Sequence, residues 1–391
     1  MSNIFVVEAL RTPFGSFGGV LADVPAPQLA ATVMKGLLER SGLAAGLVDE
    51  VIVGQVISGG CGQAPARQAM RTAGLSDTTH SMTINMVCGS GLKAIMLGAD
   101  SIRARESQVV IAGGMENMSL VPYFLKKART GYRMGHGEFL DMLLHDGLQD
   151  PDTGRHMGEI GEASIERNGL TREELDAFAI RSYELAQAAV SGGVFVDEIV
   201  PVVKKGKKGD EIIAVDEEPF RGDPGKLPSL RPVFRKDGTI TAGNASTIND
   251  GAAMALLTDD AGLQKYGLKP KARIVASATE SLHPDYFPEA NIGAIEKVCA
   301  RAGLKVADID LFEINEAFSS VAVLTMKKLG LPLDKVNVQG GACAIGHPIG
   351  ASGARLAATV IRELHKRQAR YGLATICIGG GQAVAVIFER V

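Results

Sequence analysis

The sequence has no tryptophan, only 5% aromatic residues and only five cysteines among 391 residues. The cysteine number is odd and no two form a C-x-x-C pair, which excludes a disulfide scaffold and predicts reduced thiols. Cys343 and His347 are the closest pair of zinc-ligand types, and a structural zinc site would need a second pair. We therefore expect no metal.

An excess of charge is also lacking, since the formal net charge is −3 and charged residues make up 22%. This balance favours neither nucleic acid nor a membrane surface as a partner. The longest uncharged apolar stretch, Ala374–Phe388, has 15 residues, fewer than the roughly 18 to 20 that cross a bilayer. Residues Met1–Arg11 predict a short strand and lack the basic start and apolar run of a signal peptide. We therefore expect a cytoplasmic protein without a transmembrane helix.

An internal repeat is present, in a chain with 46% hydrophobic residues and 47 glycines. Three segments recur in the same order at an offset of 261 to 266 positions. Each predicts part of a strand-and-helix unit, so we infer two copies of one α/β unit with mostly parallel sheets. The matched pairs are Gly42–Val53 with Gly303–Ile314, Ser90–Lys93 with Ser352–Arg355, and Val109–Gly114 with Thr375–Gly380.

Residues from about 119 to 247 have no counterpart in the second copy and predict an insertion into the first. A Thr171-x-x-Glu174 capping box and apolar residues at helical spacing predict a helix that ends at Gly192-Gly193. The basic run Lys204–Lys208 is typical of a hairpin tip, either a solvated turn or an anion-binding one.

Cys88 is the first candidate for chemistry, in Asn85-Met-Val-Cys88-Gly-Ser-Gly. A strand-like segment, Met82–Val87, precedes it and a helical pattern, Leu92–Ile102, follows. The thiol would thus lie at a helix amino terminus, where the macrodipole favours the nucleophilic thiolate. The alternative is a buried structural cysteine.

The same segment also fits a dinucleotide fingerprint, Gly89-x-Gly91-x-x-Ala94, with Glu116 placed where a ribose-binding acid would follow. An NAD-dependent enzyme is therefore an alternative hypothesis. The Ser352 copy of the repeat lacks this fingerprint, which favours duplication of a fold over cofactor binding.

His347, between Gly346 and Pro348, is predicted to lie on a fixed loop. In the second copy it occupies nearly the place that Cys88 has in the first, so the repeat predicts that thiol and imidazole meet. The alternative is a histidine on a surface loop.

Two further candidates follow predicted strands. Cys377 precedes Gly379-Gly380-Gly381, whose backbone amides suit an oxyanion hole, although a buried strand cysteine is the alternative. Asn315 follows the apolar strand Leu311–Ile314, where it would serve the site or cap the next helix.

Taken together, Asn85-Met-Val-Cys88-Gly-Ser-Gly, Asn315-Glu-Ala-Phe, Gly346-His347-Pro-x-Gly-x-Ser-Gly and Cys377-Ile-Gly-Gly-Gly resemble the thiolases over the whole chain. The Arg155-His-Met-Gly158 segment resembles the acetyl-CoA acetyltransferase branch. The resemblance implies a five-layered αβαβα core of two duplicated halves, an inserted CoA-binding loop domain and a homotetramer. It places the first half at residues 1–118 and 248–270, the loop domain at 119–247 and the second half at 271–391.

The resemblance also implies roles for individual residues. Cys88 would be acylated after activation by His347, and Asn315 with His347 would order a water at the first oxyanion site. Cys377 would be the second acid or base, and backbone amides of Cys88 and Gly379 would form the second oxyanion site. CoA and the acyl group would contact Leu148, His156, Met157, Arg221, Phe234, Ala242, Ser246, Phe287, Ala317 and Phe318.

The expected reaction is condensation of two acetyl-CoA to acetoacetyl-CoA and CoA, and its reverse, with CoA as substrate and no cofactor. Phe287-Pro288 resembles the mitochondrial acetoacetyl-CoA thiolases, some of which accept 2-methyl-branched acyl groups, so a broader or branched-chain 3-ketoacyl-CoA thiolase is an alternative. A non-catalytic protein that binds acyl-CoA is the remaining alternative.

Overall fold

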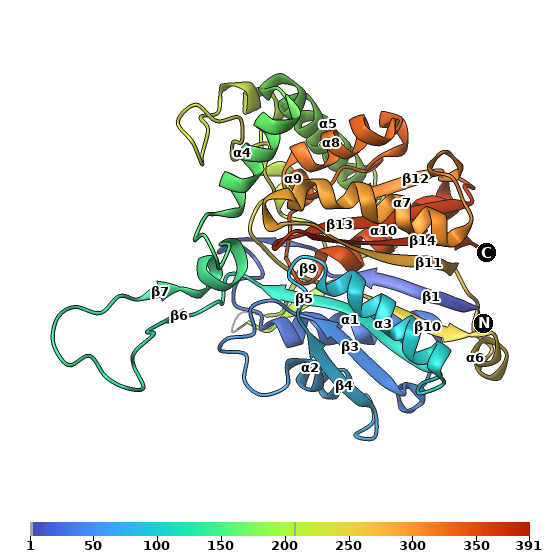
Figure 1. Cartoon of the computed structure of the whole chain (residues 1–391). Helices are drawn as coiled ribbons and strands as arrows, with labels where there is room; N and C mark the ends of the chain where they lie inside the picture. Colours follow the sequence, from blue (N-terminus) through green and yellow to red (C-terminus); the bar gives the residue numbers. More distant parts are fainter. Residues whose placement is uncertain (1–2, 207–208) are drawn as a thin grey trace.

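The computed structural model describes residues 3–206 and 209–391 (Figure 1). Its largest element is a ten-stranded sheet with the order β12-β13-β14-β11-β1-β10-β5-β3-β4, in which β2 also pairs with β10. The strands are β1 (Ile4–Arg11), β2 (Gly15–Ser16), β3 (Glu50–Gly54), β4 (His80–Ile84), β5 (Val109–Asn117), β10 (Asn249–Asp259), β11 (Ala272–Ser281), β12 (Leu311–Ile314), β13 (Tyr371–Ile378) and β14 (Gln382–Arg390).

The sheet confirms the sequence repeat. In the first half β3 runs parallel to β5, and β5, β10 and β1 then alternate in direction. In the second half β12 runs parallel to β13, and β13, β14 and β11 alternate in the same way. The halves join where β1 pairs antiparallel with β11, with Ile4 opposite Ile274.

The prediction of mostly parallel sheets is wrong, because most strand pairs are antiparallel. The sequence shows the reason at Gly379–Gly381, which connects β13 directly to β14. Strands joined by so short a turn must run in opposite directions, whereas parallel neighbours need a crossover such as a helix.

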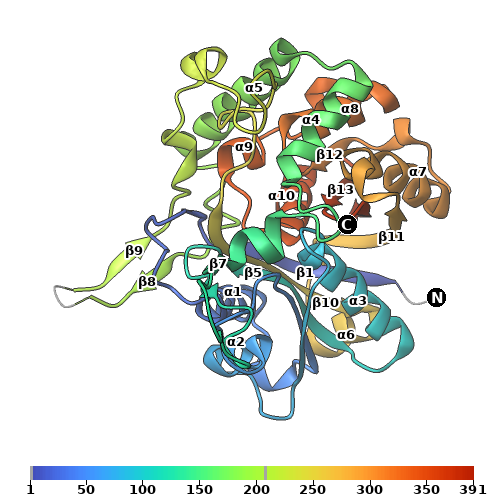
Figure 2. The same ribbon diagram turned by 60° about the vertical axis from the view of Figure 1, so that its left-hand side comes forward.

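Helices from both halves form three layers around the strands (Figure 2). Helices α3 (Ser90–Ala104) and α10 (Ser352–Lys366) share one apolar core with strands of both halves. Helices α1 (Ala26–Ser41) and α2 (Pro65–Ala73) cover the outer face of the first half, and α7 (Ala290–Ala302) and α8 (Ser319–Leu329) cover that of the second. The strands of each half form one layer, and α3 and α10 lie between the two strand layers. The resulting order, helix, strand, helix, strand, helix, is the five-layered core that was expected.

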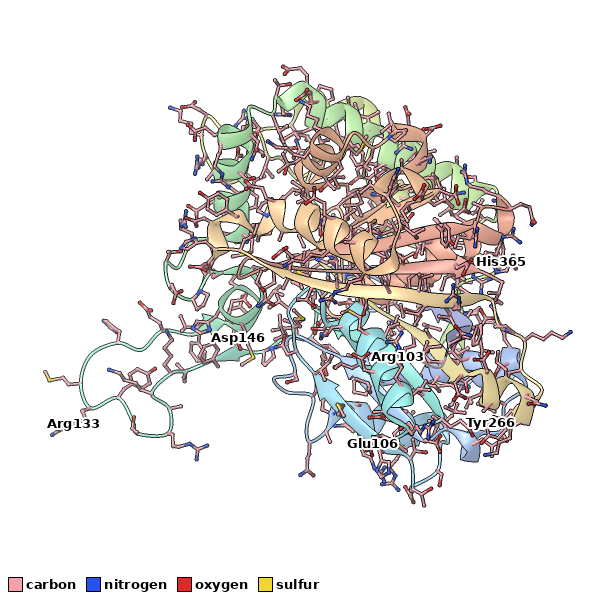
Figure 3. The ribbon with its side chains drawn as sticks, turned by 45° about the vertical axis from the view of Figure 1, so that its right-hand side comes forward. Arg103, Glu106, Arg133, Asp146, Tyr266 and His365 are labelled. Carbon is pink, nitrogen blue, oxygen red and sulfur yellow. The ribbon has the colours of Figure 1, made fainter. Side chains whose placement is uncertain are left out.

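The inserted segment lies over one end of these layers. It contains α4 (Met157–Asn168) and α5 (Arg172–Ser191), and both bonds of the predicted Thr171–Glu174 capping box are present. The chain between β6 (Tyr123–Phe124) and β7 (Leu140–Asp141) projects from the body, with Arg133 at its far end (Figure 3). Strands β8 (Val202–Lys204) and β9 (Glu211–Ile213) pair as the expected hairpin, but residues 207–208 of its tip lie outside the described residues.

The remaining elements are short. They are α6 (Asp260–Tyr266), α9 (Ala342–Ile345), the π-helical turn η2 (Leu143–Leu148) and the 3-10 turns η1 (Ala45–Leu47), η3 (Glu218–Phe220), η4 (Pro224–Ser229), η5 (Pro284–Glu289), η6 (Val306–Asp308) and η7 (Leu333–Lys335). In the described ranges, no helix is both long and apolar enough to span a membrane.

Candidate active site

One cavity of about 220 Å³ collects most of the residues singled out from the sequence. Cys88, His347, Cys377 and Gly379 line it together, so the two halves meet at this point as the repeat predicted. The predicted CoA and acyl contacts in its lining are Leu148, His156, Met157, Phe234, Ser246, Phe287, Ala317 and Phe318. Side chains not predicted from the sequence complete the apolar wall, among them Val87, Met118, Ile248 and Ile349.

A strained turn presents Cys88 to the cavity. Val87 has a φ of 44°, an unfavourable value for a β-branched residue. The side chains on either side hold this turn: Asn85 Oδ1 accepts the Val87 N–H at 2.9 Å, and Ser90 Oγ accepts the Met86 N–H at 2.8 Å. Ser90 Oγ also donates to the Val87 carbonyl at 2.7 Å. The residues around Cys88 therefore form a rigid turn that precedes α3.

The glycines of the dinucleotide fingerprint have packing roles instead. A Cβ on Gly89 would lie 2.3 Å from Ile378, and a Cβ on Gly91 would lie 2.8 Å from the Gly350 carbonyl oxygen. Glu116 is fully buried and accepts hydrogen bonds from backbone amides. None of these residues is placed to hold a dinucleotide, so the fingerprint reflects close packing of the two halves.

Burial outweighs the helix terminus at Cys88. Although Cys88 keeps some exposed surface towards the cavity, burial of the sulfur raises the pKa of its thiol to about 11, partly opposed by a hydrogen bond from the Gly379 amide. The expectation that the helix terminus favours thiolate in the resting protein is therefore wrong. At neutral pH the thiol is protonated and requires a base.

His347 is placed to be that base. Its ring is buried, and burial, assisted by the charge of Arg355, lowers its pKa to about 3, so the imidazole is neutral. Nδ1 lies 2.6 Å from Ser352 Oγ, and the same hydroxyl donates to the Pro348 carbonyl at 2.9 Å. Ser352 Oγ then accepts the Nδ1 proton, which leaves Nε2 as the basic nitrogen. Nε2 has no protein partner in the described part of the chain, and His347 faces the same cavity as Cys88.

Sequence reasoning missed the residues that hold His347. The His347 N–H donates to Asn249 Oδ1 at 2.8 Å, and a Cβ on Gly346, whose φ is 104°, would lie 2.4 Å from the Asn249 side chain. Ser352 could have been found, because it matches Ser90 in the repeat and both hydroxyls donate to a carbonyl of the preceding loop. Asn249 lies 98 residues away in sequence and carries no such signal.

Cys377 and Asn315 lie deeper in the protein. Cys377 is the penultimate residue of β13 and is 1% exposed, and burial, together with the neighbouring Cys88, raises its pKa far above the usual range of a thiol. Asn315 is fully buried, lies outside the cavity lining, and its amide oxygen and nitrogen both lack a protein partner among the described residues. The capping interpretation of Asn315 is wrong, because α8 begins after Phe318 without a side-chain cap.

The inserted segment supplies the outer wall of the cavity. His156 caps α4, and its Nδ1 accepts the Gly158 N–H at 3.0 Å, so its proton lies on Nε2. Its ring stacks on Phe234 with centroids 4.7 Å apart, and Phe234 meets Phe318 edge-on at 6.1 Å.

Two predicted CoA contacts lie outside the cavity lining. Arg221 is exposed and pairs with Glu217 at 3.4 Å, and Ala242 is exposed. Their contact with CoA stays a prediction. Within residues 3–206 and 209–391, no group of three or more His, Cys, Asp or Glu side chains is arranged to hold a metal ion.

The site and the duplicated fold define a thiolase. The family descriptions "Thiolase, N-terminal domain" and "Thiolase, C-terminal domain" match residues 4–261 and 268–390, so the chain belongs to the thiolase family. It is 48% identical to an acetyl-CoA acetyltransferase of Pseudomonas aeruginosa, with all of both chains covered. It is 46% identical to an acetyl-CoA acetyltransferase of Escherichia coli over the full length of both. The crystal structure of the Bacillus anthracis acetyl-CoA acetyltransferase superposes with a TM-score of 0.97 at 40% identity, covering 100% of this chain and 99% of that one.

Proposed function

We propose that this thiolase condenses two acetyl-CoA molecules to acetoacetyl-CoA and CoA, and catalyses the reverse thiolysis. The full-length relatives named acetyl-CoA acetyltransferase support this substrate choice. The observation that carries the mechanism is the cavity in which two protonated thiols, Cys88 and Cys377, meet the neutral imidazole of His347. Claisen chemistry needs an acyl carrier and a separate acid or base, and two thiols fill both roles.

In the first half-reaction, His347 Nε2 takes the Cys88 proton as the sulfur attacks the acetyl carbonyl. The C–S bond to CoA breaks, and Cys377 gives its proton to the departing CoA sulfur. The products are acetyl-Cys88, free CoA, imidazolium and the Cys377 thiolate. Every proton and electron pair is accounted for within the protein and substrate.

In the second half-reaction, the Cys377 thiolate removes a proton from the methyl carbon of the second acetyl-CoA. Burial supports this role, since a thiol with a strongly raised pKa has a strongly basic thiolate. The resulting enolate attacks acetyl-Cys88, and His347 returns its proton to the Cys88 sulfur. Acetoacetyl-CoA leaves and the resting protonation states are restored.

Two sets of donors would stabilise the oxyanions. At the first, imidazolium Nε2–H and a water held by Asn315 would face the enolate oxygen; the buried amide of Asn315, without a protein partner, suits a bound water. At the second, backbone N–H groups of Cys88 and Gly379 would face the tetrahedral oxygen, and the Gly379 amide already points at the Cys88 sulfur.

Phe287 favours a short acyl group. The ring is 3% exposed, lines the cavity and lies 6.5 Å from the Phe318 ring, so it limits the length of a straight chain. Pro288 fixes the backbone next to it. A ring that limits a straight chain does not by itself exclude a methyl branch, so a branched-chain 3-ketoacyl-CoA thiolase is the second candidate.

The protein is also proposed to be a homotetramer of the cytoplasm that needs no cofactor, with residues 119–247 as its CoA-binding loop domain. Large apolar side chains exposed on the projecting segment, Tyr132, Met134 and Phe139, and just before it, Leu120 and Tyr123, support self-association. The chemistry needs both thiols reduced, which favours a reducing compartment. Light scattering that gives the mass of a monomer would refute the tetramer.

One assay tests the reaction itself. Adding CoA to acetoacetyl-CoA and the enzyme should remove the absorbance of acetoacetyl-CoA and produce acetyl-CoA. An unchanged absorbance at saturating substrate, in a folded protein, would refute the proposed function.

A further inference from the structure

Glu116 is a buried carboxylate that the mechanism does not use. It lies at the end of β5 with no exposed surface. Its Oε2 accepts the Val56 and Gly350 N–H groups, each at 2.9 Å, and its Oε1 accepts the Ile57 N–H at 3.2 Å. All of its hydrogen-bond donors within the described residues are thus backbone amides.

This arrangement is unfavourable unless the surrounding structure holds the donors in place. Burial raises the pKa of Glu116 to about 7, while the three amides oppose the rise by stabilising the charged form. Hydrogen bonds to the ionised form, which the three amides favour and which predominates above pH 7, are about twice as strong as neutral ones. The loops that supply the amides are therefore firmly tied to this side chain.

One of these loops contacts the turn that presents Cys88, and the other is the loop that carries His347. The Val56 carbonyl accepts the Asn85 side-chain N–H at 3.1 Å, and Asn85 shapes the turn that presents Cys88. Gly350 lies three residues after His347 on the same loop. One continuous series of hydrogen bonds therefore runs from the Cys88 turn through Val56 and Glu116 to the His347 loop.

Close packing leaves this connection little freedom. A Cβ on Gly350 would lie 2.7 Å from Glu116 Oε2, and a Cβ on Gly114 would lie 1.9 Å from the Gly350 carbonyl oxygen. The His347 loop therefore crosses the end of β5 in direct backbone contact. A change at Glu116 would be transmitted to the loop and would not be absorbed by empty space.

We propose that Glu116 is a positioning residue, which holds the His347 loop of the second half against the Cys88 turn of the first. The inference rests on the proposed roles of Cys88 and His347. Glu116 would thus affect the rate at which Cys88 is acylated without contacting the substrate.

The test is Glu116→Gln, which keeps the shape of the side chain and replaces one acceptor oxygen by a donor. The variant should slow single-turnover acetylation of Cys88 at saturating acetyl-CoA by about tenfold or more. The KM for acetyl-CoA should stay within about twofold, because the CoA-facing wall is untouched. Acetylation is followed by intact mass and counted per folded molecule.

Glu50→Gln is the matched control. Glu50 is also buried, at the opposite end of the neighbouring strand β3, where it accepts the Ser101 and Ser107 hydroxyls at 2.6 and 2.9 Å. Its loss should lower the free energy of unfolding without changing acetylation. Acetylation of Glu116→Gln within twofold of the parent, or equal slowing in Glu50→Gln, would overturn the proposal.

A second measurement needs no variant. In the parent protein, hydrogen exchange of the Val56 and Gly350 amides should be as slow as that of the central strands, and exchange within seconds would contradict the connection. This result does not depend on the chemistry. A parent enzyme that fails to acetylate Cys88 would instead refute the proposed function, so the two failures can be told apart.

Discussion

Replacing His347 by alanine should separate the contribution of the imidazole from that of the thiol itself. With a pKa of about 11, Cys88 is ionised in about one molecule in ten thousand at pH 7. Proton transfer to His347 during attack removes this requirement, a contribution of up to about 5 kcal/mol. His347→Ala should therefore acetylate Cys88 up to about ten thousand times more slowly at pH 7.

The parent and the His347→Ala variant should also differ in how the rate of acetylation depends on pH. In the parent, Cys88 loses its proton only near pH 11, His347 gains one only near pH 3, and Glu116 is ionised above its pKa of about 7. Single-turnover acetylation should therefore change little between pH 8 and 9. In His347→Ala, the rate should rise about tenfold per pH unit, because only the thiolate reacts and its fraction grows until pH reaches the thiol pKa.

The assay is quenched single-turnover acetylation at saturating acetyl-CoA, followed by intact mass. His365→Ala is the control: this histidine lies near the carboxyl end of α10, outside the lining of the active-site cavity, and its Nε2 lies 2.7 Å from the Lys271 carbonyl oxygen. Figure 3 shows it on the side of the molecule opposite the projecting chain that carries Arg133. It should react as the parent does. A parent profile that titrates near pH 8 to 9, or His347→Ala within tenfold of the parent at pH 7, would refute the reasoning.

Three further predictions concern the surrounding residues. Cys377→Ala should spare acetylation of Cys88 but slow condensation by roughly a hundredfold, the usual loss of a general acid or base; equal loss of both steps, measured by intact mass and by acetoacetyl-CoA formation, would mean that Cys377 is no separate base. Ser352→Ala leaves the buried Nδ1–H of His347 without an acceptor, a cost of about 1 to 3 kcal/mol, and should slow acetylation about tenfold or more with KM unchanged; an unchanged rate would show that Ser352 does not set the tautomer. The parent should cleave acetoacetyl-CoA well, 2-methylacetoacetyl-CoA measurably and straight-chain substrates of six or more carbons poorly, and Phe287→Gly should raise the rate of thiolysis of the long straight chains. Specificity constants that show efficient long-chain cleavage by the parent would contradict the pocket argument.

Much of the fold and the pairing of the main site residues could be predicted from the sequence. The repeat placed Cys88 and His347 on equivalent loops, and the structure brings both to one cavity. The capping box at Thr171 and the end of the same helix at Gly192 are local signals that the structure reproduces. Such features depend on neighbours a few residues away, which the sequence shows directly.

What depends on distant neighbours could not be predicted. The antiparallel pairing of β1 with β11 at Ile4 and Ile274 has no local signal. The protonation of Cys88 was misjudged because burial by both halves outweighs the helix terminus. Asn249 reaches the His347 loop only after folding. The strand pairing, the protonation state of Cys88 and the contact of Asn249 all depend on tertiary packing between segments that are distant in sequence.

The central claim, that Cys88 is the acyl carrier activated without the second substrate, is tested most directly by acetyl-CoA alone. Intact mass followed by peptide mapping should show one acetyl group per chain, on Cys88. No acetyl group, or one on Cys377 or Cys61 with Cys88 free, would contradict the account.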